Sequence, residues 1–87
     1  MNKKIPNSIS VKIEFDDNLK KITNTSGYSI TISTNVSFYV LLNSVFTEHP
    51  DIPQKYKPGE LAFTINNNPP KEYSPLLNGD IVRFKII

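Results

Sequence analysis

Proton-transfer chemistry in this chain would have to centre on His49, its one histidine. A catalytic base needs a nucleophile or an orienting acid within hydrogen-bond reach. Glu48 and Asp51 are close to His49 in the sequence, but neighbours at a helix end do not converge on one point. The pattern therefore predicts no catalytic residue. We interpret His49 as a solvent-facing residue at a helix C-terminus, where the helix dipole favours it.

Metal binding would depend on Asp16, Asp17 and Asp80, because the chain has no cysteine. These aspartates form no D-x-D-x-D-G loop and no cluster with histidine. We predict that Asp16 and Asp17 build a turn. We also predict that Asp80, which follows Gly79, fixes the turn into the last strand through side-chain-to-backbone hydrogen bonds. The sequence thus predicts no metal site and no cofactor, and the lack of cysteine excludes disulfides and protein-borne persulfides.

Basic residues occur in three pairs, which are Lys20 with Lys21, Lys55 with Lys57, and Arg83 with Lys85. The net charge of +2 is too small to indicate nucleic acid, whose binding sites are usually dense basic patches. Four phenylalanines are spaced as core residues rather than as a platform for stacking bases. They are Phe15, Phe38, Phe63 and Phe84. The pattern therefore predicts no nucleic-acid partner.

The length of 87 residues predicts one domain with one modest core. Residues 1–7 are polar and contain a proline, so we expect a loose N-terminal arm followed by a single domain over 8–87. No apolar run approaches the roughly 18 residues that a membrane helix needs, and no apolar signal core follows the basic start. We interpret the protein as cytoplasmic, without a membrane partner.

Two strands are predicted in the first part of the chain. Apolar and polar residues alternate cleanly over 8–15, and again over 28–33, as in half-buried strands with one wet face. Turn clusters at 16–18 and 24–27 separate them. Residues 19–23 are compatible either with a continuation of the first strand or with the tip of a hairpin, and the pattern does not decide between the two.

One helix is predicted, because apolar residues from Phe38 to Phe46 follow the spacing of a helix that lies on a sheet. Ser37 is a suitable N-cap, since its hydroxyl can accept a hydrogen bond from the first turn, and Thr34 or Asn35 could serve instead. Pro50 ends the helix. The Pro- and Gly-containing stretch 49–60 is predicted to be a loop or a short irregular turn.

The last third of the chain predicts a strand over 61–65, ended by the Asn- and Pro-rich segment 66–70. A very short strand is compatible with 71–73. The closing strand, 81–87, directs Val82, Phe84 and Ile86 to one face. The other face receives Ile81, Arg83, Lys85 and Ile87.

This order of elements predicts an α+β fold of the β-grasp (ubiquitin-like) type, a mixed four- to five-stranded sheet over one main helix. The strand at 8–15 should pair in parallel with the strand at 81–87, in the middle of the sheet. A ferredoxin-type sandwich would need a second amphipathic helix, and none is visible. The predicted core consists of Ile9, Val11, Ile13, Ile30, Ile32, Leu41, Leu42, Val45, Phe63, Val82 and Phe84.

Several short motifs occur in the order seen in ubiquitin-like sulfur carriers of molybdopterin and thiamine biosynthesis. Residues 74–82 resemble the run T-P-L-x-x-G-D-x-V that enters the last strand of those carriers. Residues 37–42 look like their T-V-x-x-L-L helix start, His49-Pro50 resembles their helix terminator, and 63–67 resemble their V-N-G strand, with Asn67 in place of the glycine. The resemblance is to the molybdopterin-synthase small subunit and its thiamine relative, and it covers most of 8–87.

The resemblance implies a function that depends on the chain end. In those carriers a flexible tail ends in Gly-Gly, whose carboxylate is adenylated and then converted to a thiocarboxylate. The sequence here ends at Ile87 without Gly-Gly, so we expect a non-enzymatic protein-interaction or accessory module. The alternatives are a sulfur carrier-like protein with an atypical C-terminus, which an activating enzyme would serve, and a small regulatory subunit of a larger enzyme.

The open face of the predicted sheet is the candidate partner-binding surface, because ubiquitin-like folds commonly use this face. Strand alternation places Lys12, Arg83 and Lys85 there. Ile81 and Ile87 add apolar area beside these charges, a mixture that suits a protein interface. We therefore predict a protein partner at Lys12, Ile81, Arg83, Lys85 and Ile87.

Overall fold

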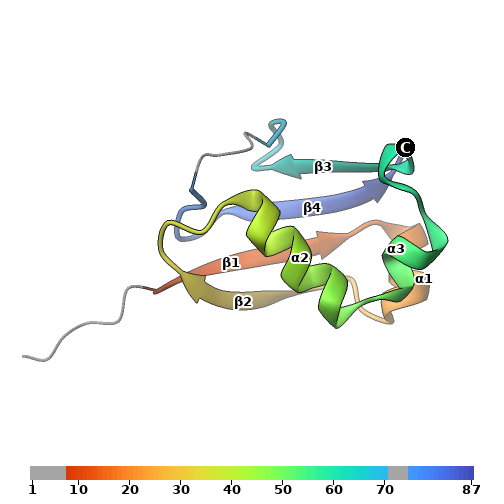
Figure 1. The fold of residues 1–87 in the computed structure, drawn as a ribbon, viewed down its shortest axis with the longest axis horizontal. Coiled ribbons are helices and arrows are strands. Elements are labelled where there is room, and N and C mark those ends of the chain that lie inside the picture. The colour runs from red at the N-terminus through yellow and green to blue at the C-terminus, as the bar shows by residue number, and fades with distance from the viewer. Residues whose placement is uncertain (1–7, 71–74) are drawn as a thin grey trace, which may run out of the picture.

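Four strands form one mixed sheet in the order β2-β1-β4-β3 (Figure 1). The strands are β1 (Ser8–Phe15), β2 (Gly27–Ser33), β3 (Leu61–Ile65) and β4 (Ile81–Ile86). This computed structural model describes residues 8–70 and 75–87, so the predicted arm at 1–7 and the short strand at 71–73 lie outside the described residues.

The two central strands, β1 and β4, run parallel, with Ile13 opposite Val82 and Phe15 opposite Phe84. Each is flanked by an antiparallel partner, β2 beside β1 and β3 beside β4. A parallel neighbour requires a crossover connection, and the helical segment between β2 and β3 supplies it. The predicted β-grasp topology is therefore confirmed.

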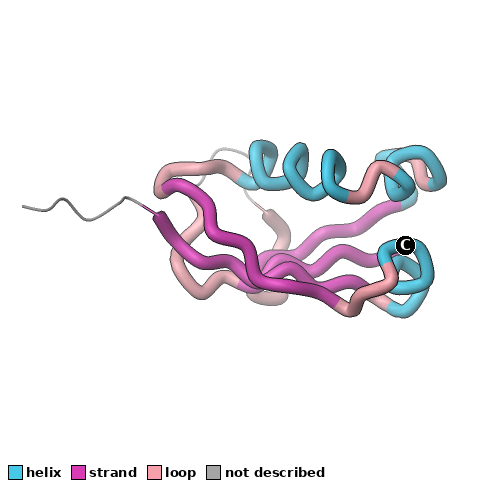
Figure 2. The backbone as a smooth tube through the Cα atoms, turned by 90° about the horizontal axis from the view of Figure 1, so that it is seen from below, coloured by secondary structure: helices cyan, strands magenta, loops and turns pink. Residues whose placement is uncertain are grey.

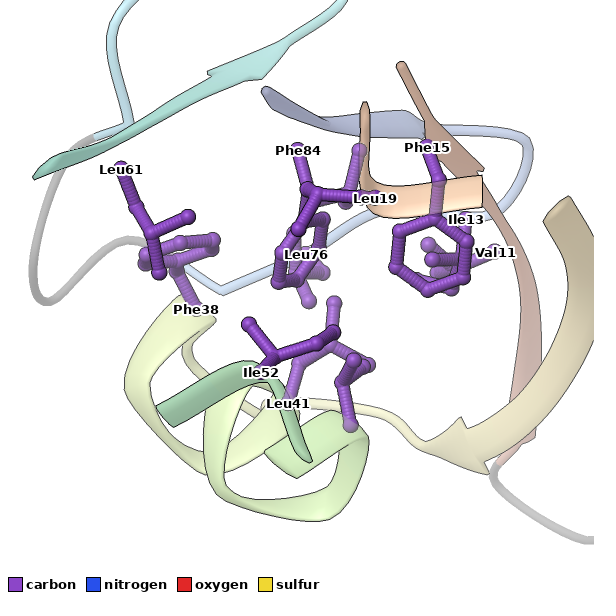
Figure 3. Close-up of a cluster of buried hydrophobic side chains, with 12 residues drawn as sticks. Val11, Ile13, Phe15, Leu19, Phe38, Leu41, Ile52, Leu61, Leu76 and Phe84 are labelled. Atoms are coloured by element: carbon purple, nitrogen blue, oxygen red, sulfur yellow. The ribbon is translucent and has the colours of Figure 1, made fainter. Parts of the chain in front are cut away.

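Helix α2 (Phe38–Glu48) lies over one face of the sheet and leaves the other face uncovered (Figure 2). Its buried residues Phe38, Leu41 and Val45 fall on the stripe that the sequence predicted. Side chains from both layers meet in the core shown in Figure 3. The buried apolar residues are Val11, Ile13, Phe15, Leu19, Phe38, Leu41, Val45, Ile52, Leu61, Leu76, Val82 and Phe84.

All eleven predicted core residues lie in the core or pack against it, but they are not all fully buried. Five of them pack against the core but are only half-buried: Ile9, Ile30, Ile32, Leu42 and Phe63. Those on β2 and β3 belong to the two edge strands of the sheet. Burial is therefore deepest along the central parallel pair.

The start of α2 lies at the predicted N-cap, Ser37, but the predicted capping bond is absent. The Ser37 side chain makes no capping hydrogen bond. Its carbonyl accepts the first helical bond, from Leu41 N at 3.2 Å, and Ser37 forms an isolated bridge with Pro75. The helix ends as predicted before Pro50, with His49 at the C-cap.

Residues 19–23 form neither a strand nor a hairpin tip, because they belong to helix α1 (Asp17–Thr23). Asp16 is its N-cap, and the Asp16 carboxylate accepts a hydrogen bond from Leu19 N at 2.8 Å. Asn24 ends the helix in the left-handed region with φ of 62°. Leu19 is fully buried, so this short helix seals one end of the core.

The predicted loop at 49–60 also contains helical structure, namely α3 (Asp51–Lys55) and the 3-10 turn η1 (Pro58–Glu60). Pro50 is the N-cap of α3 and Pro53 lies in its first turn, where a missing N–H removes no helical bond. Ile52 is fully buried beneath it. The expectation of a single helix was therefore wrong, and α1 and α3 pack together at one end of the sheet (Figure 1).

The turn into β4 is held by Asp80, as predicted. Its Oδ2 accepts a hydrogen bond from Leu77 N at 2.8 Å, and its Oδ1 accepts one from Asn66 Nδ2 at 2.9 Å. Asn66 in turn accepts a bond from Ile81 N at 2.9 Å. This network joins the end of β3 to the start of β4, so the position of β4 in the sheet depends on it.

Candidate interaction surface on the open sheet face

The uncovered face of the sheet collects the polar members of each alternating strand. Lys12 is paired with Ile81 and Glu14 with Arg83 across the parallel contact, and Lys85 lies opposite Ala62 of β3. Because paired residues share a face, Lys12, Ile81, Arg83 and Lys85 all lie on the side away from α2. The structure thus brings together the charged residues selected from the sequence, while their binding role stays a prediction.

Arg83 is not a free cation. Its Nε and Nη2 donate to Oε1 of Glu14 at 2.9 Å and 2.7 Å, and its Nη1 donates to Oδ1 of Asn67 at 3.0 Å. Lys12 Nζ lies 3.5 Å from the other oxygen of Glu14. The hydrogen bond from Arg83 is the main reason why the pKa of Glu14 lies below its ordinary value, and desolvation opposes it.

Glu14 and Asn67 are site residues that the sequence reasoning missed. Glu14 is the next open-face residue after Lys12, so strand alternation contained the signal for its position. Its partner depends on the register that sets Glu14 opposite Arg83. Asn67 reaches Arg83 from the turn after β3, where it adopts a left-handed φ of 70°. Glu14 neutralises much of the charge that the sequence placed on Lys12 and Arg83.

Lys85 is exposed and has no ion pair among the described residues. Its neighbour across the β3–β4 contact is Ala62, whose small side chain leaves the lysine stem accessible. Lys85 is therefore the cation on this face best able to meet an incoming carboxylate.

Ile81 and Ile87 lie at opposite ends of the face and do not form one apolar patch. Ile81 is half-buried at the start of β4, whereas Ile87 is 80% exposed just beyond its end. Six residue-to-residue steps of extended chain separate them by about 20 Å. Ile87 N still donates to the Glu60 carbonyl at 3.0 Å, so the backbone there follows the sheet.

The interpretation of His49 as solvent-facing is wrong. Its ring is half-buried, with the ring of Phe15 5.5 Å away in an edge-on arrangement and the ring of Tyr28 5.7 Å away. These contacts give His49 a packing role at the end of α2. Residues 8–70 and 75–87 contain no group of three or more His, Asp or Glu side chains placed to hold a metal ion.

No protein-family model matches the sequence, and no curated protein matches it. The structure, however, has the ubiquitin-like β-grasp fold, an α+β class, which it shares with solved structures of other small proteins. No helix within 8–70 or 75–87 is long and apolar enough to cross a membrane.

Three solved structures illustrate the likeness. One is a Pyrococcus furiosus protein assigned as molybdopterin converting factor, subunit 1, with a TM-score of 0.77 and 13% identity over 90% of this chain and 97% of its own. Small archaeal modifier protein 1 from Haloferax volcanii gives 0.74 and 9%, covering 88% and 95%. The Methanosarcina acetivorans protein of the same description gives 0.67 and 17%, covering 91% and 93%. Identities this low establish the fold alone.

Proposed function

We propose that this chain is a non-enzymatic accessory protein that binds a protein partner through the open face of its sheet. The observation that carries the proposal is the uncovered charged array of Lys12, Glu14 and Arg83, with Lys85 unpaired beside it. The bonded array presents a fixed pattern of charge, and Lys85 beside it adds an exposed cation that can meet a carboxylate of the partner. The proposal includes the cytoplasmic location predicted from the sequence.

An acidic partner suits this surface. Three cations and one carboxylate lie on the central strands, so the face is positive on balance. Long-range attraction would raise the encounter rate, and affinity would fall as salt screens the charges. The flanking β2 residues are small and polar, namely Ser29, Thr31 and Ser33, so a partner could approach the strands closely.

The test is capture of the partner from the organism's own cells by chemical cross-linking, with identification by mass spectrometry. Lys85→Glu should lose the partner, whereas Lys21→Glu should retain it, because Lys21 makes the same charge change on α1, which lies at one end of the sheet. If both variants retained the partner, the proposed interface would be wrong. The apolar depression lined by Pro53 and Tyr56 would then be the next surface to test.

A sulfur carrier is the second candidate, because the likeness to a molybdopterin converting factor subunit and to small archaeal modifiers favours it. That function requires a C-terminal Gly-Gly whose carboxylate can be activated. Intact-mass measurement of the protein isolated from its own cells separates the two functions. A mass that corresponds to Gly-Gly bearing sulfur in place of one carboxylate oxygen would favour the carrier over the accessory protein.

A further inference from the structure

The outer edge of β2 carries a row of unpaired backbone groups. The bond from Phe15 N to the Ser26 carbonyl, at 2.9 Å, fixes which pairs of the β1–β2 ladder are hydrogen-bonded. Counting in steps of two, Tyr28, Ile30 and Ile32 bond to β1. The alternate residues therefore direct N–H and C=O outward, away from the sheet. They are Ser29, Thr31 and Ser33, and within the described residues these groups have no hydrogen-bond partner.

The β1–β4 contact agrees with this assignment. Lys12 N donates to the Asp80 carbonyl, and the Ser10 carbonyl accepts from Gly79 N. The even-numbered residues of β1 therefore direct their backbone N–H and C=O groups toward β4. The odd-numbered residues of β1 must then direct their backbone groups toward β2. Figure 2 views the molecule from the β2 side, with α2 above the strands.

This edge lacks the devices that normally protect an exposed strand. Natural edge strands are usually short, or carry charged residues, proline or bulges that block further pairing. β2 is seven residues long, with the sequence GYSITIS, and contains no charge and no proline. Its β-branched residues favour extended structure. An unprotected edge of this kind fits a strand that is added by a binding partner.

A groove follows the same edge on the helix side. It has a volume of about 680 Å³ and runs between β2 and α2. Its apolar lining includes Ile30 of β2 and Val40 of α2, and Val40 is 53% exposed although it is aliphatic. Side chains at alternate positions of an added strand would enter this groove, since they point to the helix side of the sheet.

The charge of the groove indicates which side chains the added strand should carry. Glu48 is the one acidic residue of its lining, and no lysine or arginine lines it. Glu48 lies at the Tyr28 end, where its charge contributes to raising the pKa of the Tyr28 hydroxyl, after the larger effect of burial. A basic residue at this end of the added strand would complement Glu48.

We propose that the β2 edge binds an extended segment of a partner protein in antiparallel register, with aliphatic side chains against Val40 and a lysine or arginine against Glu48. This site is separate from the open face, and each can fail without the other. Antiparallel pairing places the basic residue near the C-terminal end of the bound segment, because β2 begins at that end.

Two synthetic peptides of identical composition test the site. The first, acetyl-Thr-Val-Thr-Val-Thr-Lys-Thr-amide, places two valines and then the lysine on the groove side of an antiparallel strand. The second, acetyl-Thr-Lys-Thr-Val-Thr-Val-Thr-amide, places the lysine at the far end from Glu48. Titration into the ¹⁵N-labelled protein should shift the β2 amides and slow hydrogen exchange at Ser29, Thr31 and Ser33. The first peptide should bind about three- to tenfold more tightly.

Two variants of the protein make the test specific. Thr31→Pro removes one outward N–H and should weaken binding of the first peptide by about tenfold or more. Thr31→Ala, its matched control, keeps the N–H and should bind within about twofold of wild type. Glu48→Lys should weaken the lysine peptide by about three- to tenfold and favour its glutamate counterpart, acetyl-Thr-Val-Thr-Val-Thr-Glu-Thr-amide. Circular dichroism confirms that each variant is folded.

Several outcomes would overturn the proposal. They are shifts that map away from β2, equal affinity for the two peptides, or binding that Thr31→Pro does not affect. Exchange protection of the β2 amides that appears without peptide, and grows with protein concentration, would also overturn it. That result would assign the edge to a second copy of this chain. The capture experiment with Lys85→Glu reports on the open face independently.

Discussion

Arg83 of β4 donates two hydrogen bonds to a single carboxylate oxygen of Glu14 on β1, from Nε at 2.9 Å and from Nη2 at 2.7 Å. The two residues are direct partners in the parallel register. The contact therefore joins the first and last strands of the fold on the open face, opposite the packing of Phe15 against Phe84 on the core face, at 5.7 Å between ring centroids. One face of this strand pair is held by charge and the other by aromatic packing.

Reversing the charge of Arg83 should destabilise the protein more than reversing that of Lys85. Arg83→Glu sets two carboxylates directly opposite each other and removes the bond to Asn67, so we expect a loss of roughly 1 kcal/mol. Lys85→Glu breaks no described ion pair and should change the free energy of unfolding by less than about 0.5 kcal/mol. Urea unfolding at low salt measures the free energy of unfolding of both variants. Equal losses would show that the Glu14 contact contributes nothing to stability.

The Glu14 contact should also appear in the dependence of stability on pH. The pKa of Glu14 in the folded state lies below its ordinary value of 4.5. Its contribution is therefore fully present above that value and is lost as the pH falls through the folded pKa, since the unfolded chain binds the proton first. The carboxylate is partly exposed, so the effect should be small and should shrink in high salt. Glu14→Gln should flatten the acid limb of the stability curve; an unchanged limb would contradict this assignment.

Leu41 and Leu42 provide a direct test of how α2 packs. Both lie on the predicted apolar stripe, but Leu41 is 1% exposed while Leu42 is half-buried. Leu41→Ala should lose about 2–5 kcal/mol, the usual range for a buried leucine. Leu42→Ala, to which the sequence alone would assign that range, should lose about 1–2 kcal/mol. Thermal unfolding of both variants measures these losses of stability. A larger loss for Leu42→Ala than for Leu41→Ala would mean that α2 is rotated about its axis and turns Leu42 into the core.

The strands and their faces could be predicted because each depends on local alternation. Period-two patterns at 8–15 and 81–87 identified both the core side and the open side. The short helices could not, since five or seven residues are too few for a helical period to show. The main sequence signal for α1 is its N-cap Asp16, and an aspartate at that position is equally typical of a turn. In α3 the buried residue is Ile52, whose packing in the core is a tertiary contact with no local signal.

The sequence predicted on which face of the sheet the charged residues lie, but not which of them pair with one another. Alternation placed Lys12, Arg83 and Lys85 on one side of the sheet, and the structure agrees. Which cation meets Glu14 depends on the register between the two ends of the chain, a long-range alignment with no local signal. Asn67 accepts a hydrogen bond from Arg83 out of the turn after β3, where its backbone is in the left-handed region, and no local pattern predicts this contact.

Gly27 should tolerate no side chain. Its φ is +152°, and an added Cβ would lie 2.1 Å from the Ile13 carbonyl oxygen, a backbone atom that cannot move aside without breaking the β1–β2 ladder. Gly27→Ala should therefore lose at least about 2 kcal/mol. Gly59→Ala is the matched control, because an added Cβ there meets nothing within 4 Å. If the two variants unfolded at the same denaturant concentration, the start of β2 would have to lie elsewhere.

Tyr28→Phe should leave the protein as stable as wild type or make it slightly more stable. The Tyr28 hydroxyl is buried and has no hydrogen-bond partner among the described residues, and such a group costs about 1–3 kcal/mol relative to a bonded one. Burial, followed by the charge of Glu48, raises the pKa of Tyr28 above 10.0. Stability should therefore fall as the pH rises above that value, because the tyrosine ionises first in the unfolded chain. Phenylalanine should remove the part of this alkaline loss that Tyr28 causes. A loss of more than about 1 kcal/mol on replacement at neutral pH would mean that the hydroxyl has a partner.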